Sequence, residues 1–87
     1  MYTVLFSRQA EKEFDSLPAP VRERLYMILK KQLAADPFDS ALDTKKLRPP
    51  FSEYRLRMGI YRCIFEVDKK SKSIQIYHIL HRKDAYK

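Results

Sequence analysis

The chain has little of several residue types on which common classes of protein depend. It contains one cysteine, Cys63, so it can form no internal disulfide bond and offers no cysteine cluster for a metal ion. It contains one glycine, Gly59, which excludes the glycine-rich loops that hold nucleotide phosphates. No apolar run approaches the roughly 20 residues of a membrane-spanning helix, and the apolar start reaches Arg8 too soon for a secretory signal. We therefore expect a reduced, cytoplasmic protein without a metal, a small-molecule cofactor or a membrane partner.

The length of 87 residues allows one small domain. A chain of this size buries about 60–65% of its unfolded surface, which is enough for one core between two layers of secondary structure. No internal repeat, low-complexity tract or linker divides the sequence. We therefore interpret residues 1–87 as a single domain.

Positive charge is concentrated in the second half of the chain. The sequence carries 18 lysine and arginine residues against 11 aspartate and glutamate residues, a net charge of +7. Residues 1–44 hold six basic and seven acidic side chains, whereas residues 45–87 hold twelve and four. Such an excess attracts polyanions: nucleic acid, the ribosome, an anionic membrane or an acidic protein. We favour a nucleic-acid target, although many small proteins are basic for solubility alone.

The spacing of apolar residues changes from helical to strand-like after residue 50. It predicts a strand at 1–6, helices near 8–17 and 20–35, an irregular segment at 37–50, and strands near 53–58, 61–68 and 73–80. A proline-rich turn joins the two helices, and a tight turn containing Gly59 joins the first two strands of the last group. This order predicts an α+β fold: an N-terminal strand, a helical hairpin on one sheet face, then a three-stranded antiparallel meander.

Three arginines of the predicted meander are candidates for binding phosphate. Alternation places Arg55 and Arg57 on the face away from the helices, and the reversal at Gly59 brings Arg62 onto the adjacent strand, where it can share that face. The open face is therefore expected to present two or three guanidinium groups. Like charges this close repel unless an anion meets them, although such arginines are also the usual solvated side of a half-buried sheet. A guanidinium binds phosphate with two parallel donors and stabilises a phosphorane.

Cleavage of RNA also needs a base for the 2′-hydroxyl and an acid for the departing 5′-oxygen. Arginine serves poorly for either role because it hardly deprotonates. His81 and Tyr86, near the end of the sequence, are titratable candidates, and the sequence leaves open which of them acts. His78 alternates with apolar neighbours and is expected in the core, and Cys63 is expected to be buried and inert.

The order of these motifs resembles the RelE/ParE superfamily of bacterial toxins, on the RelE side. The similarity covers nearly the whole chain: the stretch Ser7–Phe14, a Lys-Leu pair at 46–47, Tyr-Arg-x-Arg, a turn and Tyr-Arg within 53–67, and a closing His-Arg-x-x-x-Tyr at 81–86. The resemblance implies a RelE-like sandwich similar to microbial ribonucleases. It also implies a ribosome-dependent, metal-free endoribonuclease that enters the A site, cleaves mRNA by 2′-hydroxyl attack and is neutralised by a cognate antitoxin.

The resemblance also gives roles to the basic residues of the meander. Arg62 corresponds to the arginine that stabilises the phosphate, and Arg55 and Arg57 correspond to the basic pair that handles the phosphate and the mRNA backbone. Lys46 is similar to a basic residue that lines the site, and Arg48 in the same basic run is expected to bind RNA with it.

In the tail, Arg82 and Tyr86 resemble the pair that orients the nucleotide and takes part in proton transfer, with His81 as the competing base. Two other functions stay open. ParE-like members of the superfamily poison DNA gyrase and are not nucleases, and a toxin-like domain without activity would only bind RNA or its antitoxin. Titratable side chains near the arginines favour the nuclease over the gyrase inhibitor.

Overall fold

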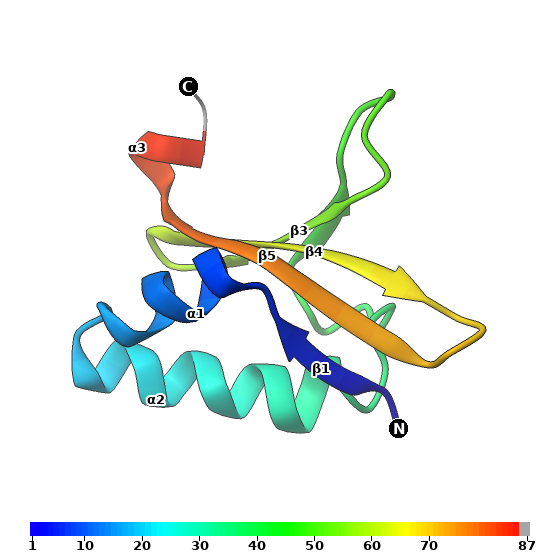
Figure 1. Cartoon of the computed structure of the whole chain (residues 1–87), viewed down its shortest axis with the longest axis horizontal. Coiled ribbons are helices and arrows are strands. Elements are labelled where there is room, and N and C mark those ends of the chain that lie inside the picture. Colours follow the sequence, from blue (N-terminus) through cyan, green and yellow to red (C-terminus); the bar gives the residue numbers. More distant parts are fainter. Residues whose placement is uncertain (86–87) are drawn as a thin grey trace.

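The computed structural model describes residues 1–85. A strand, two helices, four strands and a short helix follow one another along the chain (Figure 1). The elements are β1 (Thr3–Phe6), α1 (Arg8–Asp15), α2 (Ala19–Met27), the π-helical segment η1 (Ile28–Leu33), β2 (Thr44–Lys46), β3 (Tyr54–Met58), β4 (Tyr61–Asp68), β5 (Ser73–His81) and α3 (Arg82–Ala85). None of the described helices is long and apolar enough to cross a membrane.

A five-stranded mixed sheet with the strand order β1-β5-β4-β3-β2 forms the centre of the fold. β3, β4 and β5 make the predicted antiparallel meander, whereas β1 pairs with β5 in parallel. Gly59 lies in the two-residue turn between β3 and β4 with a φ of 59°. Glycine adopts a positive φ at little cost because it has no Cβ, so this tight reversal is possible where the sequence has its one glycine.

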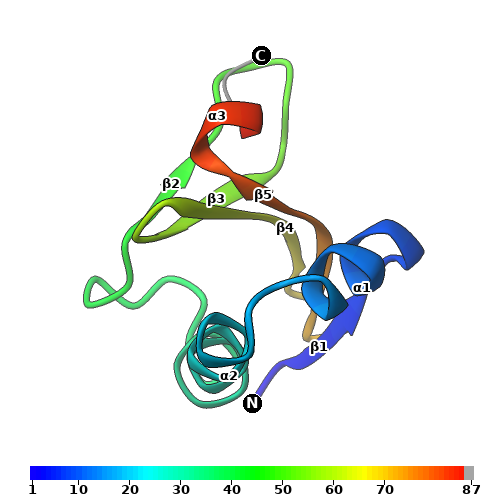
Figure 2. The same cartoon turned by 90° about the vertical axis from the view of Figure 1, so that its left-hand side faces the viewer.

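The helical hairpin covers one face of the sheet, and α3 stands on the other side (Figure 2). α1 begins directly after Ser7, whose hydroxyl accepts the Ala10 N–H at 3.0 Å and so caps the helix. The core lies between the helices and the sheet, which confirms the predicted α+β fold. Its largest fully buried side chains include Leu25, Leu29, Leu33, Phe65, Ile74 and Ile76.

The two helices differ in detail from the sequence-based expectation. The first ends at Asp15 rather than at residue 17. The second changes from an α-helix to a π-helix after Met27, and near its end the Ala34 N–H reaches back five residues to the Leu29 carbonyl at 3.0 Å. The wider π turn has no distinct signal in residue spacing over so short a segment.

The strands also differ at their ends, and one of them was not predicted. β1 begins at Thr3, β3 begins at Tyr54, and β5 runs one residue further than predicted, to His81. Residues 44–46, which were expected to be irregular, form β2 because their backbone pairs with β3. Three residues are too few to show a periodic pattern, and β2 forms because it pairs with a strand later in the chain. Local sequence preference therefore does not reveal β2.

A β-bulge in β5 changes which side chains face the helices. The pairing of β4 with β5 shifts register and leaves Tyr77 as an extra residue in β5. Beyond the bulge Ile79 is buried, while the side chain of His78 is 49% exposed and lies 3.6 Å from the Glu13 carboxylate. The expectation that His78 lies in the core is therefore wrong, because the alternation on which it rests ends at the bulge.

Candidate functional site

The open face of the sheet carries the arginines that the sequence singles out. Arg57 on β3 pairs directly with Arg62 on β4, and Arg55 lies two residues before Arg57 on the same face. Residues directly opposite on neighbouring strands have Cβ atoms about 4.5–5.5 Å apart, so the side chains of Arg57 and Arg62 start side by side. Their neighbours Leu56 and Cys63 point to the core. The register thus confirms that the three arginines originate on the face away from the helices.

Arg57 is held by Asp43, which precedes β2. Its Nε donates to Asp43 Oδ2 at 2.6 Å, and its backbone N–H donates to the Asp43 carbonyl at 2.9 Å. Both side chains are about half exposed, so water surrounds this ion pair. The Asp43 carboxylate accepts its hydrogen bond from the Nε–H of the guanidinium. Within residues 1–85 the terminal nitrogens of Arg57 make no further hydrogen bond, and they remain donors for an anion.

Arg62 is more deeply placed than the sequence predicts, since only 6% of its surface is exposed. Its Nη1 donates to the carbonyl of Gly59 at 2.8 Å and to that of Tyr61 at 2.9 Å, so the guanidinium bends back over the turn between β3 and β4. Its Nε is buried without a hydrogen-bond partner among the described residues. The expectation that Arg62 is openly presented on the sheet face is therefore wrong. It is a fixed and largely enclosed cation.

The basic residues before the meander lie beside this face in different ways. Register pairs Lys45 with Arg55 and Lys46 with Tyr54, so Lys45 shares the arginine face. The Lys46 amine lies 5.9 Å from the centre of the Tyr54 ring. Arg48 is exposed on the loop that rises from the sheet between β2 and β3 (Figure 1). Lys45 was not predicted as a site residue, because its face follows only from the pairing of β2 with β3.

His81 lies on the other side of the sheet from the arginine pair. It ends β5 opposite Tyr61, with the two ring centres 6.0 Å apart. Because Tyr61 packs against the core, this register places His81 on the helix side, whereas Arg57 and Arg62 start on the open side. The Nδ1 of His81 accepts the backbone N–H of Lys83 at 3.2 Å. The structure therefore does not bring His81 together with the arginines.

Arg82 lies next to the turn over which the Arg62 side chain bends. It begins α3, its side chain is exposed, and its backbone N–H donates to the Ile60 carbonyl at 2.7 Å. This bond connects the start of α3 to the turn between β3 and β4, the two strands that carry the arginines. The candidate Tyr86 lies outside the described residues.

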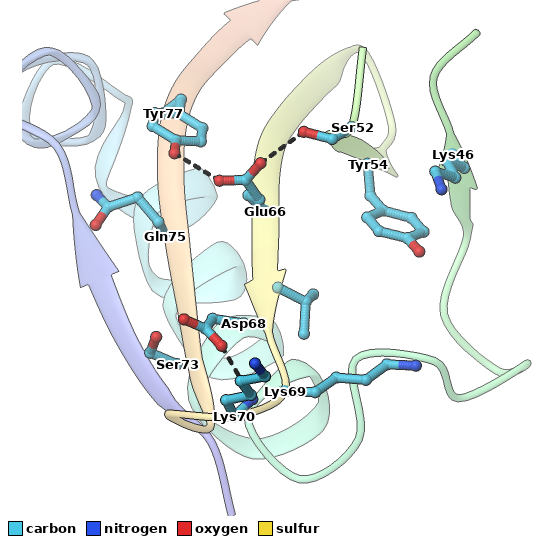
Figure 3. Close-up of a pocket in the computed structure, with 11 residues that line it drawn as sticks. Lys46, Ser52, Tyr54, Glu66, Asp68, Lys69, Lys70, Ser73, Gln75 and Tyr77 are labelled. Carbon is cyan, nitrogen blue, oxygen red and sulfur yellow. Dashed lines mark hydrogen bonds between the residues drawn. The ribbon is translucent and has the colours of Figure 1, made fainter. Parts of the chain in front are cut away.

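A polar groove of about 620 Å³ lies on the open face, where β4 and β5 approach their shared turn (Figure 3). Glu66 on β4 is at its centre. Glu66 Oε2 accepts from the Ser52 hydroxyl at 2.6 Å, and Oε1 accepts from the Tyr77 hydroxyl at 2.9 Å. The Ser52 and Tyr77 hydroxyls hold the pKa of Glu66 below its ordinary value of 4.5, so the carboxylate is charged at neutral pH. The bond to Glu66 in turn raises the pKa of Tyr77.

This groove was not predicted from the sequence. Strand alternation placed Glu66 on the same face as Arg62, and this was its one signal in the sequence. The hydroxyl donors come from a loop residue, whose position does not follow from periodicity, and from Tyr77, whose face follows from alternation but whose contact with Glu66 depends on the pairing of β4 with β5. Lysines from two different segments also line the groove: Lys46, Lys69 and Lys70.

Comparison with known proteins shows the family of this chain. The family model for the ParE toxin of the type II toxin–antitoxin system parDE matches residues 4–86. The toxin RelE3 of Methanocaldococcus jannaschii is 33% identical over 84 residues, which cover 95% of this chain and 93% of that protein. The chain belongs to the RelE/ParE superfamily of type II toxins, on its RelE-like branch.

Solved structures agree with the assignment of this chain to the RelE-like branch. The archaeal RelE–RelB complex of Pyrococcus horikoshii contains a chain that is 31% identical and superposes with a TM-score of 0.78, over 93% of this chain and 94% of that one. The RelBE2 toxin–antitoxin complex of Mycobacterium tuberculosis gives a TM-score of 0.82 at 24% identity, over 93% and 98% of the two chains, which shows the shared fold. The RelE-like fold that the motifs imply is thereby confirmed.

Proposed function

We propose that this RelE-like toxin is a ribosome-dependent endoribonuclease that cleaves mRNA in the ribosomal A site and thereby stops translation. The observation that carries the proposal is the direct pairing of Arg57 with Arg62 on a sheet face that also holds Arg55. Like charges on directly opposed residues repel each other, and the Asp43 carboxylate meets only the Nε side of Arg57, so the terminal nitrogens of Arg57 remain donors for an anion. A phosphodiester suits these planar donors, because each guanidinium offers two parallel N–H groups to its oxygens.

In the proposed reaction the 2′-hydroxyl of one nucleotide attacks the adjacent phosphate. The 2′-oxygen–phosphorus bond forms as the bond to the 5′-oxygen breaks, which leaves a 2′,3′-cyclic phosphate and a free 5′-hydroxyl. Negative charge grows on the non-bridging oxygens, where a cation fixed in advance stabilises the transition state more than the ground state. Arg62 suits this role because two backbone carbonyls already hold its Nη1. Arg55 and Arg57 position the mRNA backbone beside it, with Lys46 and Arg48 at the edge.

Proton transfer in this proposal belongs to the tail, where Arg82 orients the nucleotide. A base must take the 2′-proton and an acid must protonate the departing 5′-oxygen. His81 lies on the helix side of the sheet, so we assign Tyr86 as the proton-transfer residue to be tested first. Changing Tyr86 to Phe should lower single-turnover cleavage roughly 10²–10⁴-fold with binding nearly unchanged, whereas His81→Gln should have a much smaller effect.

We also propose that the toxin acts in the cytoplasm and is held inactive there by an acidic cognate antitoxin. The related toxins of Pyrococcus horikoshii and Mycobacterium tuberculosis were both solved as complexes with their antitoxins. The excess of basic residues after position 44 offers an acidic partner the same surface that would otherwise bind RNA.

A ParE-like inhibitor of DNA gyrase is the alternative, because the family model that matches the chain is the one for ParE toxins. Induction of the toxin in growing cells separates the two functions. A nuclease stops protein synthesis and leaves cut mRNA while DNA stays intact. A gyrase inhibitor damages DNA first, with translation initially normal.

A further inference from the structure

The Glu66 carboxylate is held in one orientation but keeps acceptor capacity. The hydroxyls of Ser52 and Tyr77 each donate one hydrogen bond, one to each carboxylate oxygen. An ionised carboxylate has about four acceptor positions, so each oxygen of Glu66 retains a further lone pair. Two acceptor oxygens, fixed by two protein donors, therefore stand in a groove that is open on the sheet face (Figure 3).

The backbone of β5 brings one of those donors into place. Tyr77 is the extra residue of the β-bulge, and its hydroxyl donates to Glu66 from the open face, which it shares with Gln75. The bulge itself is supported from the helix layer, because the Ser7 hydroxyl donates to the Tyr77 carbonyl at 2.9 Å. Bulges occur commonly beside functional sites, and this one lies beside the carboxylate that the Ser52 and Tyr77 hydroxyls orient.

The groove lies on the path of a strand that crosses the arginine face. Glu66 follows Arg62 by four residues on β4 and shares its face, a separation of about 13 Å along the strand. A phosphate at the arginines would therefore place a neighbouring nucleotide of the same chain over the groove. Lys46, Lys69 and Lys70 line the groove and supply positive charge for the backbone of that nucleotide.

We propose that this groove binds one base of the RNA strand and that Glu66 reads the base through its N–H donors, with guanine preferred. The proposal rests on the nuclease function proposed above and adds a specificity-determining residue to it. Among the four RNA bases, guanine presents a ring N–H and an amino group side by side on one edge, which match the two oxygens of a carboxylate. Cytosine and adenine each offer an amino group beside a ring nitrogen that is an acceptor. This ring nitrogen would face the second carboxylate oxygen of Glu66, and two acceptors repel each other.

The test compares cleavage of ribosome-bound mRNAs that differ at one nucleotide near the cut, with guanosine, adenosine or inosine at that position. Inosine lacks the amino group but keeps the ring N–H. Wild-type protein should cleave the guanosine mRNA roughly 5- to 30-fold faster than the adenosine mRNA, and the inosine mRNA at an intermediate rate. This ratio is at the lower end of the range for paired base contacts because the groove is open to water. Glu66→Gln should remove most of this difference, because one acceptor becomes a donor.

Glu23→Gln on α2 makes the same chemical change on the helix side and should keep the wild-type preference. Ser52→Ala leaves the carboxylate in place but removes one of its two supports, so it should reduce the preference only in part. Equal guanosine preference in wild type and Glu66→Gln would overturn the proposal, as would an equal loss of cleavage on all three mRNAs. Absence of cleavage by the wild-type protein on every mRNA would instead refute the nuclease function itself.

Discussion

Two hydroxyl donors set the ionisation of Glu66, and the bond from Ser52 contributes most to its lowered pKa. Because the folded pKa lies below the ordinary value of 4.5, this carboxylate stabilises the fold at pH values above 4.5. That contribution is lost as the pH falls through the folded pKa. Ser52→Ala should therefore raise the pKa of Glu66 toward 4.5 and make stability less sensitive to acid, which an NMR titration of the carboxyl carbon measures. Ser40→Ala, at another exposed loop serine, is the matched control, and an unmoved Glu66 pKa in Ser52→Ala would contradict the assignment.

Cys63 illustrates the opposite environment, since it lies inside the core between the sheet and the helices. Burial, with a smaller contribution from the Glu13 carboxylate, raises the pKa of its thiol to about 12. Only about one thiol in 10⁴ is then ionised at pH 8, and the thiolate is the reactive form. We expect a disulfide reagent at pH 8 to react with native protein at least 100-fold more slowly than with protein in denaturant. Similar rates in the two conditions would show that the site is open.

Ser7 connects the first helix to the bulge in the last strand. Its hydroxyl accepts the Ala10 N–H at 3.0 Å and donates to the Tyr77 carbonyl at 2.9 Å, so one side chain serves as helix cap and as support for β5. Loss of a helix cap alone costs about 0.5–2 kcal/mol. We therefore expect Ser7→Ala to lower the free energy of unfolding by about 1–3 kcal/mol in urea denaturation, because a strand carbonyl also loses its donor. Ser40→Ala should change it by less than about 0.5 kcal/mol, and an equal effect of the two would contradict this role.

The elements that the sequence predicts are those whose packing repeats along many residues. Both helices and the three meander strands bury regular stripes, and the turn at Gly59 needs the one residue without a Cβ. The face of Arg55 and Arg57 follows from alternation and was predicted correctly, whereas the face of Arg62 also depends on the register across the turn at Gly59. Features that depend on distant contacts were not predictable: β2 needs its partner β3, and the burial of Arg62 needs the carbonyls at the turn. The bulge in β5 likewise moved His78 out of the core.

Net charge differs between the helical first part of the chain and the strands that follow it. Residues 45–87 carry twelve basic against four acidic side chains, and this segment holds β3, β4 and β5. An acidic antitoxin that meets this surface loses part of its attraction when salt screens the charges. We expect the protein encoded by the neighbouring gene to form a stable complex whose dissociation constant rises between 0.05 and 0.5 M salt, measured by calorimetry. A complex of unchanged affinity over this range would assign its stability to apolar contacts instead.

The sheet face on which Arg57 and Arg62 originate is proposed to cleave mRNA on the ribosome. The direct measurement uses purified toxin, programmed ribosomes with an empty A site, and end-labelled mRNA under single-turnover conditions. We predict a cut within the A-site codon that leaves a 2′,3′-cyclic phosphate. Arg62→Ala should be slower by roughly 10²–10³-fold, the loss typical of one donor to a developing oxyanion. Circular dichroism establishes that this variant is folded, Arg62→Lys tests whether charge alone suffices, and Arg8→Ala on α1 should cleave as the wild type does. Intact mRNA with the wild-type toxin, or equal rates for folded Arg62→Ala and wild type, would contradict the claim.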